Sequence, residues 1–190
     1  MNKVVCYIIL ILSISGGLSC QEDSTNIIKK YNHSLQMGTI DWVFGTARMN
    51  YEWLMQQKHG IVVEGRLPLL SKNTGYAFNV QYRKHKTPGM KAGYWGIFVN
   101  YIHDEGTLEI KEDDETKKYG YKAKTITAGA YFGKKWVWNH GISLAYRLGY
   151  GIPFSDFKWK NDVPKQRRLI EAFYKIFSGI DTEFTVGICF

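Results

Sequence analysis

Two short stretches of the sequence carry residue types that can move protons or attack an acyl group. His103 is followed by Asp104 and Glu105, and Ser155 is followed by Asp156. These are the groups that acid–base and nucleophilic catalysis use, but no spacing singles them out, and the chain has no zinc motif, phosphate loop or nucleophile elbow. We predict no catalytic residues and keep an enzyme as an alternative, because all five histidines lie near predicted strand ends, where a surface role is the simpler interpretation: His33, His59, His85, His103 and His140.

The segment 103–118 is strongly acidic, with seven carboxylates against three lysines, a net charge of −4. Such a segment can hold a divalent cation. It lacks the Asp-x-Asp-x-Asp-Gly spacing of a calcium loop. We interpret it as a mobile, solvated loop and predict neither a metal nor a cofactor.

The strongest pattern is a set of seven charged residues on the polar sides of predicted strands. Burying unpaired charges costs several kcal/mol each, so these side chains need one another or water. Inside a narrow barrel they could line a gated pore or ligand site, or form a plugged structural lumen, which we favour; in a soluble sheet they would be a solvated face. The seven residues are Arg48, Glu52, Glu64, Arg66, Arg83, Arg147 and Glu183.

The elements that must position these charges are strands, because apolar and polar residues alternate with a period of two along segments of about ten residues. The longest links between the segments are 104–118 and 152–180, and the link 133–140 is short. The predicted strands are 34–44, 46–55, 61–69, 76–85, 93–102, 119–134, 141–151 and 181–190.

This alternation permits two architectures. A soluble lipocalin or sandwich turns its apolar faces inward, whereas a membrane barrel turns them to lipid and its charged faces into the lumen. The chain ends on a strand at Phe190, as a closed barrel requires, because an open sheet edge cannot be left in hydrocarbon. Aromatic residues also gather toward strand ends, as in membrane girdles: Tyr51 and Trp53, Tyr76 and Tyr82, Trp95 and Tyr101, Tyr146 and Tyr150. We therefore predict an all-β fold, an eight-stranded antiparallel up-and-down transmembrane β-barrel over 34–190.

The first 20 residues are typical of a signal peptide. Lys3 precedes the apolar run Val4–Leu12, which is too short to span a bilayer, since spanning takes about 20 residues. Cleavage before Cys20 would make this cysteine a candidate lipidation site, and cleavage after it would remove it. The residues 21–33 form a polar lead-in. Of three cysteines, Cys189 is the one clearly left inside the fold, so no internal disulfide framework is predicted.

The composition and the net charge bear on the class of protein and on the kind of partner. The 190 residues include 13 Tyr, 10 Phe and 6 Trp, and the mean hydropathy of −0.28 excludes a helical membrane protein. The net charge of +8 is one indication of a nucleic-acid partner. An exported chain does not readily meet nucleic acid and the charges are spread along it, so we predict no such partner.

The last link also carries a predicted helix. Asp162 can cap it, and Pro164 falls in its first turn. Its basic residues suit the interface beside anionic lipopolysaccharide headgroups; a helix packed across the barrel mouth is the other interpretation, and both stay open. Its apolar residues fall on one face: Leu169, Ile170, Phe173, Ile176 and Phe177.

The end of the chain resembles the C-terminal sorting signal of outer-membrane proteins, with Phe190 preceded at alternate positions by Phe184, Val186 and Ile188. Cys189 departs from the polar or basic residue that is frequent at this position. Three segments resemble strands of small, mostly uncharacterised outer-membrane barrels of the Bacteroidota type: Phe44–Trp53, Gly93–Val99 and Gly179–Gly187.

This resemblance covers most of the chain from about Leu35 onward. It implies a barrel like OmpX or the OmpA membrane domain, porin-like in architecture, in the outer membrane of a Gram-negative bacterium. It implies a monomer that contacts outer-membrane lipids, lipopolysaccharide and the barrel assembly machinery, and no known chemistry. We expect a structural role, or an adhesive one through the two long loops. A lipid-modifying enzyme and a soluble periplasmic lipocalin-like binder of lipids or small molecules are the alternatives.

Overall fold

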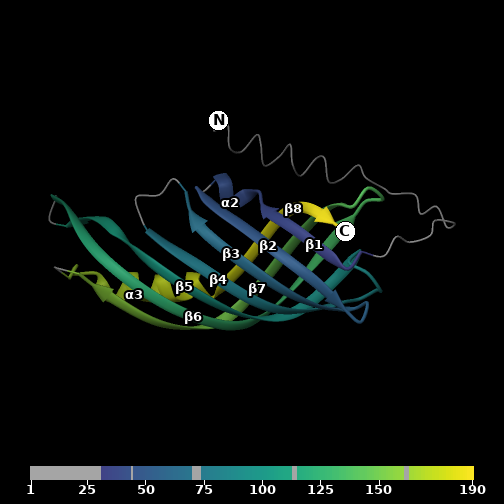
Figure 1. Cartoon of the computed structure of the whole chain (residues 1–190). Coiled ribbons are helices and arrows are strands. Elements are labelled where there is room, and N and C mark those ends of the chain that lie inside the picture. Colours follow the sequence, from purple (N-terminus) through teal and green to yellow (C-terminus); the bar gives the residue numbers. More distant parts are fainter. Residues whose placement is uncertain (1–30, 44, 70–73, 113–114, 161–162) are drawn as a thin grey trace, which may run out of the picture.

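The computed structural model describes residues 31–43, 45–69, 74–112, 115–160 and 163–190, and in these the strands close into an antiparallel barrel (Figure 1). The predicted all-β, eight-stranded, up-and-down fold is confirmed, because each strand pairs with its neighbours in chain order. The strands are β1 (His33–Gly38), β2 (Thr46–Met55), β3 (His59–Pro68), β4 (Thr74–His85), β5 (Ala92–Glu112), β6 (Glu115–Val137), β7 (Ile142–Trp159) and β8 (Ile180–Cys189). The predicted signal peptide and the cap residue Asp162 lie outside the described residues.

The two ends of the described chain close the barrel. Strand β8 pairs antiparallel with β1, with Ser34 opposite Cys189. The His33 N–H donates to the Phe190 carbonyl at 2.9 Å, and the Phe190 N–H donates to the His33 carbonyl at 2.9 Å. The pairing of β8 with β1 therefore supplies the last seam of the barrel. We call the end of the barrel where His33 and Phe190 lie the terminal rim, and the opposite end the distal rim.

The prediction of an acidic loop over 104–118 is wrong, because strands β5 and β6 continue as a paired hairpin in this segment. Charges of opposite sign stand on neighbouring strands there. Glu109 lies 3.1 Å from Lys118, and Glu105 lies 3.6 Å from Lys122. Such cross-strand pairs favour a ladder, which is why a segment rich in charge still forms strands. The hairpin projects beyond the distal rim (Figure 1).

Two other predicted boundaries change. The first strand stops at Gly38, before the predicted end at residue 44, and the short helix α2 (Ile40–Val43) follows it. A Cβ added at Gly38 would lie 2.9 Å from Arg48 Cβ and close to the Asp41 carboxylate, so this glycine leaves room for Asp41 and Arg48 to meet. Strand β7 continues to Trp159, past the predicted end at 151.

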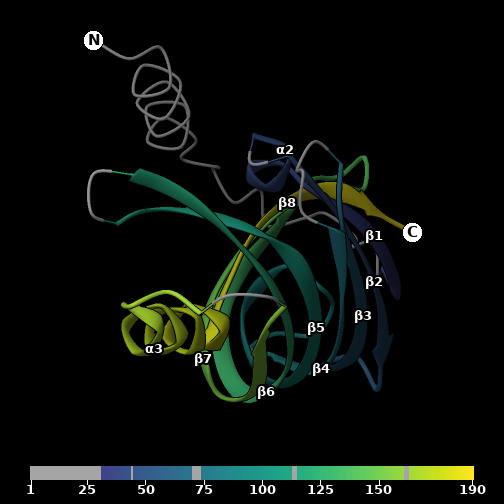
Figure 2. The ribbon, with the colours of Figure 1, turned by 90° about the vertical axis from the view of Figure 1, so that its left-hand side faces the viewer.

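The predicted helix in the last link is present as α3 (Arg167–Gly179). It lies beside β7 and is seen end-on in Figure 2, which faces the distal rim. The Trp159 indole N–H donates to Glu171 at 2.9 Å, and the ring of Tyr174 lies 5.1 Å from that of Phe157. The apolar face predicted from the spacing points away from these contacts, because Leu169, Phe173, Ile176 and Phe177 are exposed. The helix thus does not use its apolar face to close the barrel mouth.

The strands have two opposite faces. Alternate residues on each strand are buried inside the barrel, and many of these are polar or charged. The residues between them point outward and are largely apolar; Ile97 and Ile152, for example, are 56% and 66% exposed. Within the described ranges, no helix is both long and apolar enough to cross a membrane.

Candidate functional site

The candidate site is the interior of the barrel, which gathers charged side chains from six strands. All seven residues of the predicted charged face point inward; six are at most 5% exposed, and the Arg66 side chain is 20% exposed. Four titratable residues that we did not predict join them: Asp41, His85, Lys135 and Asp181. We call the whole set the lumen network: Asp41, Arg48, Glu52, Glu64, Arg66, Arg83, His85, Lys135, Arg147, Asp181 and Glu183.

Near the terminal rim the lumen network centres on Glu52, which is fully buried. The Arg83 guanidinium lies 3.0 Å from one carboxylate oxygen, and Lys135 Nζ lies 2.8 Å from the same oxygen. His85 Nε2 lies 2.7 Å from the other oxygen. Lys135 Nζ also donates to Ser34 Oγ at 2.8 Å. Both oxygens of Glu52 are thus held by groups from other strands.

Further toward the distal rim the lumen network centres on Arg147. Its guanidinium lies 2.9 Å from Glu64, 2.8 Å from Asp181 and 2.6 Å from Glu183. Arg147 and Glu183 are direct partners across the β7–β8 ladder, so the register places this pair together. Glu183 lies 4.0 Å from Arg83, which joins the two clusters.

At the mouth on the distal side, Arg48 links the barrel to α2. Its guanidinium lies 3.0 Å from Asp41, and it donates to the Thr182 carbonyl at 2.6 Å. Arg66 lies 3.1 Å from Glu64. Burial raises the pKa of Asp41 above its usual value, although the nearby Arg48 opposes that rise. The desolvation of Asp41 therefore outweighs its attraction to Arg48, and this pair adds little net stability.

The lumen network is balanced in charge and tightly packed. Buried aromatic rings fill the space around it; the Arg83 guanidinium carbon lies 4.1 Å from the centre of the Tyr94 ring, and that of Arg147 lies 5.2 Å from the centre of the Tyr131 ring. An eight-stranded barrel has an interior that side chains can just fill. Five basic residues, Arg48, Arg66, Arg83, Lys135 and Arg147, face five acidic ones, Asp41, Glu52, Glu64, Asp181 and Glu183.

Two of the residues that we missed carried a signal in the sequence, and the surface role predicted for one of them, His85, is wrong because its side chain is buried against Glu52. Asp181 precedes Glu183 by two positions and His85 follows Arg83 by two, so a period of two already places them on the charged face. Lys135 lies one residue past the predicted end of its strand, which is why the pattern did not include it. Asp41 belongs to a helix that the alternation does not indicate.

The candidate catalytic residues do not come together. His103 points outward and its ring lies tilted beside that of Tyr76, with ring centres 5.3 Å apart. Ser155 points inward and its Oγ accepts a hydrogen bond from Thr125 at 2.9 Å. His103 and Ser155 therefore lie on opposite faces of the sheet. Asp104 accepts from the Tyr121 hydroxyl at 2.9 Å, and Asp156 pairs with Lys158 at 3.0 Å.

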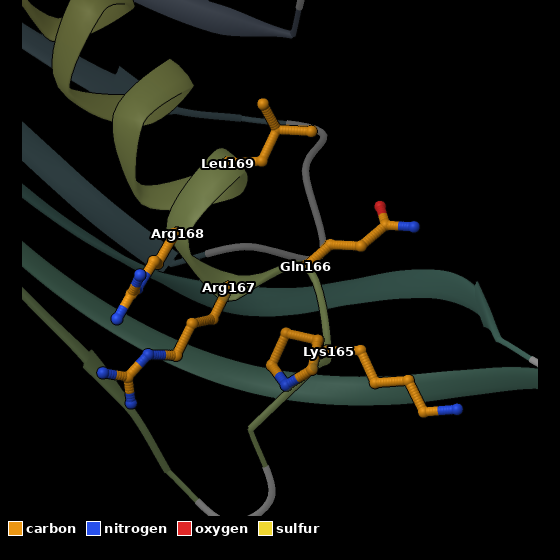
Figure 3. A pocket seen from close by; sticks show the side chains of 6 residues that line it. Lys165, Gln166, Arg167, Arg168 and Leu169 are labelled. Atoms are coloured by element: carbon orange, nitrogen blue, oxygen red, sulfur yellow. The ribbon is translucent and has the colours of Figure 1, made fainter.

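The start of α3 borders an open hollow of about 530 Å³. Figure 3 shows Arg167 and Arg168 extending to one side of the start of the helix, and Gln166 and Leu169 pointing away from them. They therefore do not form a cage for an anion. Among the described residues, no group of three histidine, cysteine or carboxylate side chains is arranged to hold a metal ion.

Comparison of the chain with family models, with known proteins and with solved structures finds no match.

Proposed function

We propose that this protein is a small outer-membrane β-barrel with a plugged, charge-paired lumen and a structural or surface-interaction role. The observation that carries the proposal is the distribution of polarity across the barrel wall. Glu52 and Arg83 are fully buried inside, while the outward Ile97 and Val99 are 56% and 53% exposed. A lipid bilayer is the solvent that favours this arrangement.

The same observation opposes a soluble lipocalin-like binder. In a lipocalin the apolar faces line a central cavity and the charged faces meet water. Here the lumen network occupies the interior, and outward apolar residues continue from strand to strand. Soluble monomers rarely expose connected apolar patches larger than a few hundred Å². The outer wall of this barrel would be such a patch in water.

Aromatic side chains near both rims support a membrane position. Trp53 and Trp95 point outward near the terminal rim and are 51% and 50% exposed. Trp42 and Tyr76 are exposed near the distal rim. Tryptophan and tyrosine favour the boundary between hydrocarbon and headgroups. The two sets then mark the edges of the apolar band.

The two rims differ as the two sides of an outer-membrane barrel do. The connections at the terminal rim are the short segments 56–58, 86–91 and 138–141, and the last of these ends at Gly141, whose φ of +84° suits a tight turn. The β5–β6 hairpin and α3 extend from the distal rim (Figure 1). We assign the terminal rim to the periplasm and the distal rim to the cell surface.

The lumen network suits a plug and not a conducting pore. Arg147 is held by three carboxylates, and Glu52 by three basic groups. Opening a path for ions would break several of these buried pairs at once, which is costly. Around the described barrel wall each strand pairs with two neighbours, and the longest unpaired edges lie in the distal extensions of β5, β6 and β7, outside the wall, which favours a monomer.

We assign the surface-interaction role to α3 and the β5–β6 hairpin. The exposed Phe173 and Phe177 lie on the apolar face of α3, and Arg167 and Arg168 lie at its start. An amphipathic helix with basic residues suits contact with the anionic headgroups of lipopolysaccharide. A lipid-modifying activity has less support, because His103 and Ser155 lie on opposite faces of the sheet.

Fractionation of expressing cells, followed by gel electrophoresis of heated and unheated membranes, tests the proposal. We expect the protein in the outer membrane, with a faster band in the unheated sample that shifts on boiling. Recovery as a soluble periplasmic protein without a shifted band would overturn the proposal.

A further inference from the structure

Three lysines surround a glycine on the outer wall near the terminal rim. Gly93 on β5 stands directly opposite Lys134 on β6, and its carbonyl accepts a hydrogen bond from the Lys86 N–H at 2.9 Å. Lys84 on β4 is the partner of Trp95, two residues further along β5. A Cβ added at Gly93 would lie 3.5 Å from Lys86 Cδ, so the lysine stem lies beside the missing side chain. We call Lys84, Lys86, Gly93 and Lys134 the Gly93 notch.

Two tryptophans flank the Gly93 notch. Lys84 Nζ lies 5.9 Å from the centre of the Trp95 ring, and Lys134 Nζ lies 4.9 Å from that of Trp136. Indole rings favour the interface between hydrocarbon and headgroups and attract ammonium groups through their faces. The ammonium groups are therefore held at the edge of the apolar band, where a headgroup would lie.

The lysines of the Gly93 notch have no carboxylate within 4.0 Å in the part of the chain that the structure describes. Outward lysines near the distal rim are different. Lys122 and Lys160 both pair with Glu105, and Lys158 pairs with Asp156 at 3.0 Å. Three outward lysines near the distal rim thus have acidic partners, whereas the three exposed lysines of the Gly93 notch stand together near the other rim without one among the described residues.

The surface next to the Gly93 notch is apolar. Trp95 stands opposite Phe132 on β6, and both are at least half exposed. Ile97 continues this surface along β5. A ligand that fits both parts has a negative headgroup for the lysines and apolar chains for the wall beside them. That combination describes an anionic lipid better than a soluble anion.

We propose that the Gly93 notch binds the phosphate headgroup of an anionic phospholipid, of the phosphatidylglycerol class, in the leaflet at the terminal rim. This inference rests on the proposed membrane location and adds a lipid preference to it. Each basic side chain near a membrane surface adds to the attraction for anionic lipid. Three of them around one position favour a phosphatidylglycerol molecule over a zwitterionic one.

The test uses the full mature chain folded into phosphatidylcholine vesicles that contain a trace of spin-labelled lipid. Electron spin resonance compares the association of labelled phosphatidylglycerol with that of labelled phosphatidylcholine. We expect a several-fold preference for phosphatidylglycerol in the wild type and its loss in the triple variant Lys84→Gln, Lys86→Gln, Lys134→Gln. The matched control, Lys122→Gln, Lys158→Gln, Lys160→Gln, removes the same charge near the distal rim and should keep the preference.

A second variant leaves all three lysines in place. Gly93→Glu brings a carboxylate to the notch, and the 3.5 Å spacing at Gly93 accommodates its Cβ. We expect this variant to lose the preference and Gly93→Ala to keep it, with folding checked by the unheated gel band. Equal association of the two lipids with the folded wild type, or a preference that survives in the triple variant, would overturn the inference alone. A wild type that restricts neither label has not inserted, and that result would overturn the proposed membrane location as well.

Discussion

At the scale of single residues, the barrel interior contains carboxylates that each contact several basic side chains. Glu52 is bonded by Arg83, His85 and Lys135, which come from β4 and β6. A buried ion pair contributes little net stability when it is complete, because both partners lose their hydration. Removing one partner is different, since it leaves the others desolvated and unpaired. The lumen network therefore contributes less to the total stability than to the choice of this strand arrangement over arrangements that would leave a buried charge unpaired.

Replacing Glu52 by Gln should destabilise the protein by about 3–5 kcal/mol, because Arg83 and Lys135 stay buried without a counter-charge. Urea unfolding in lipid vesicles measures the change. Glu109→Gln is the matched control, since its partner Lys118 is 68% exposed and such pairs are worth about 0–1 kcal/mol. Equal effects of the two changes would contradict the buried network.

Arg147→Lys should cost about 1–3 kcal/mol although the charge is kept, because one ammonium group cannot replace the fork of contacts to Glu64, Asp181 and Glu183. The same unfolding measurement applies. Arg167→Lys on the exposed start of α3 should leave the midpoint unchanged. An unchanged midpoint in Arg147→Lys would show that these contacts do not hold the interior.

At the scale of elements, close approach of the strands decides whether the barrel can close. A side chain at Gly187 on β8 would collide with the Leu35 carbonyl and with Gln36 on β1. Gly65 on β3 has nothing within 4 Å of a Cβ added there. The two glycines both lie inside strands, but only the first stands at the seam between β1 and β8.

Gly187→Val should prevent closure and abolish the faster band of unheated samples, because the added atoms push β8 away from β1. Gly65→Val serves as the matched control and should keep the band. Gel mobility before and after boiling measures both variants. A normal band in Gly187→Val would mean that the seam tolerates a side chain and is looser than described.

The sequence is sufficient to predict which residues of a strand share a face. It is less informative about where each strand ends. Alternation identified the seven inward charges, because each strand has a period of two. It did not extend β5 and β6 through 104–118, since charge on both faces there hides the period. It also could not show that Glu52 meets Lys135, because that contact depends on how the strands wrap around the barrel.

At the scale of the whole molecule, the barrel has a charged interior, an apolar outer wall and two different rims. The terminal rim holds the two ends of the described chain and short turns, and it carries the Gly93 notch, whose lysines have no carboxylate within 4.0 Å among the described residues. The distal rim carries α3 and the β5–β6 hairpin (Figure 1). This asymmetry predicts one orientation in the membrane.

Lys118→Cys should react with an impermeant maleimide on intact cells, because the proposed orientation places the β5–β6 hairpin at the cell surface. A cysteine at Lys58, in an exposed turn of the terminal rim, should react only after the outer membrane is opened. Labelling followed by mass spectrometry measures both. The opposite pattern would reverse the proposed orientation.

The proposed membrane barrel turns the outward face of its strands to lipid and the inward face to the lumen network. Spin labels placed one at a time along β4, with the native cysteines replaced, test it most directly in vesicles. We predict that labels at Phe78 and Val80, which are 49% and 42% exposed, collide with oxygen dissolved in the bilayer, whereas labels at the buried Asn79 and Gln81 are shielded from it. Labels at Phe78 and Val80 that collide instead with a water-soluble nickel complex would contradict the account.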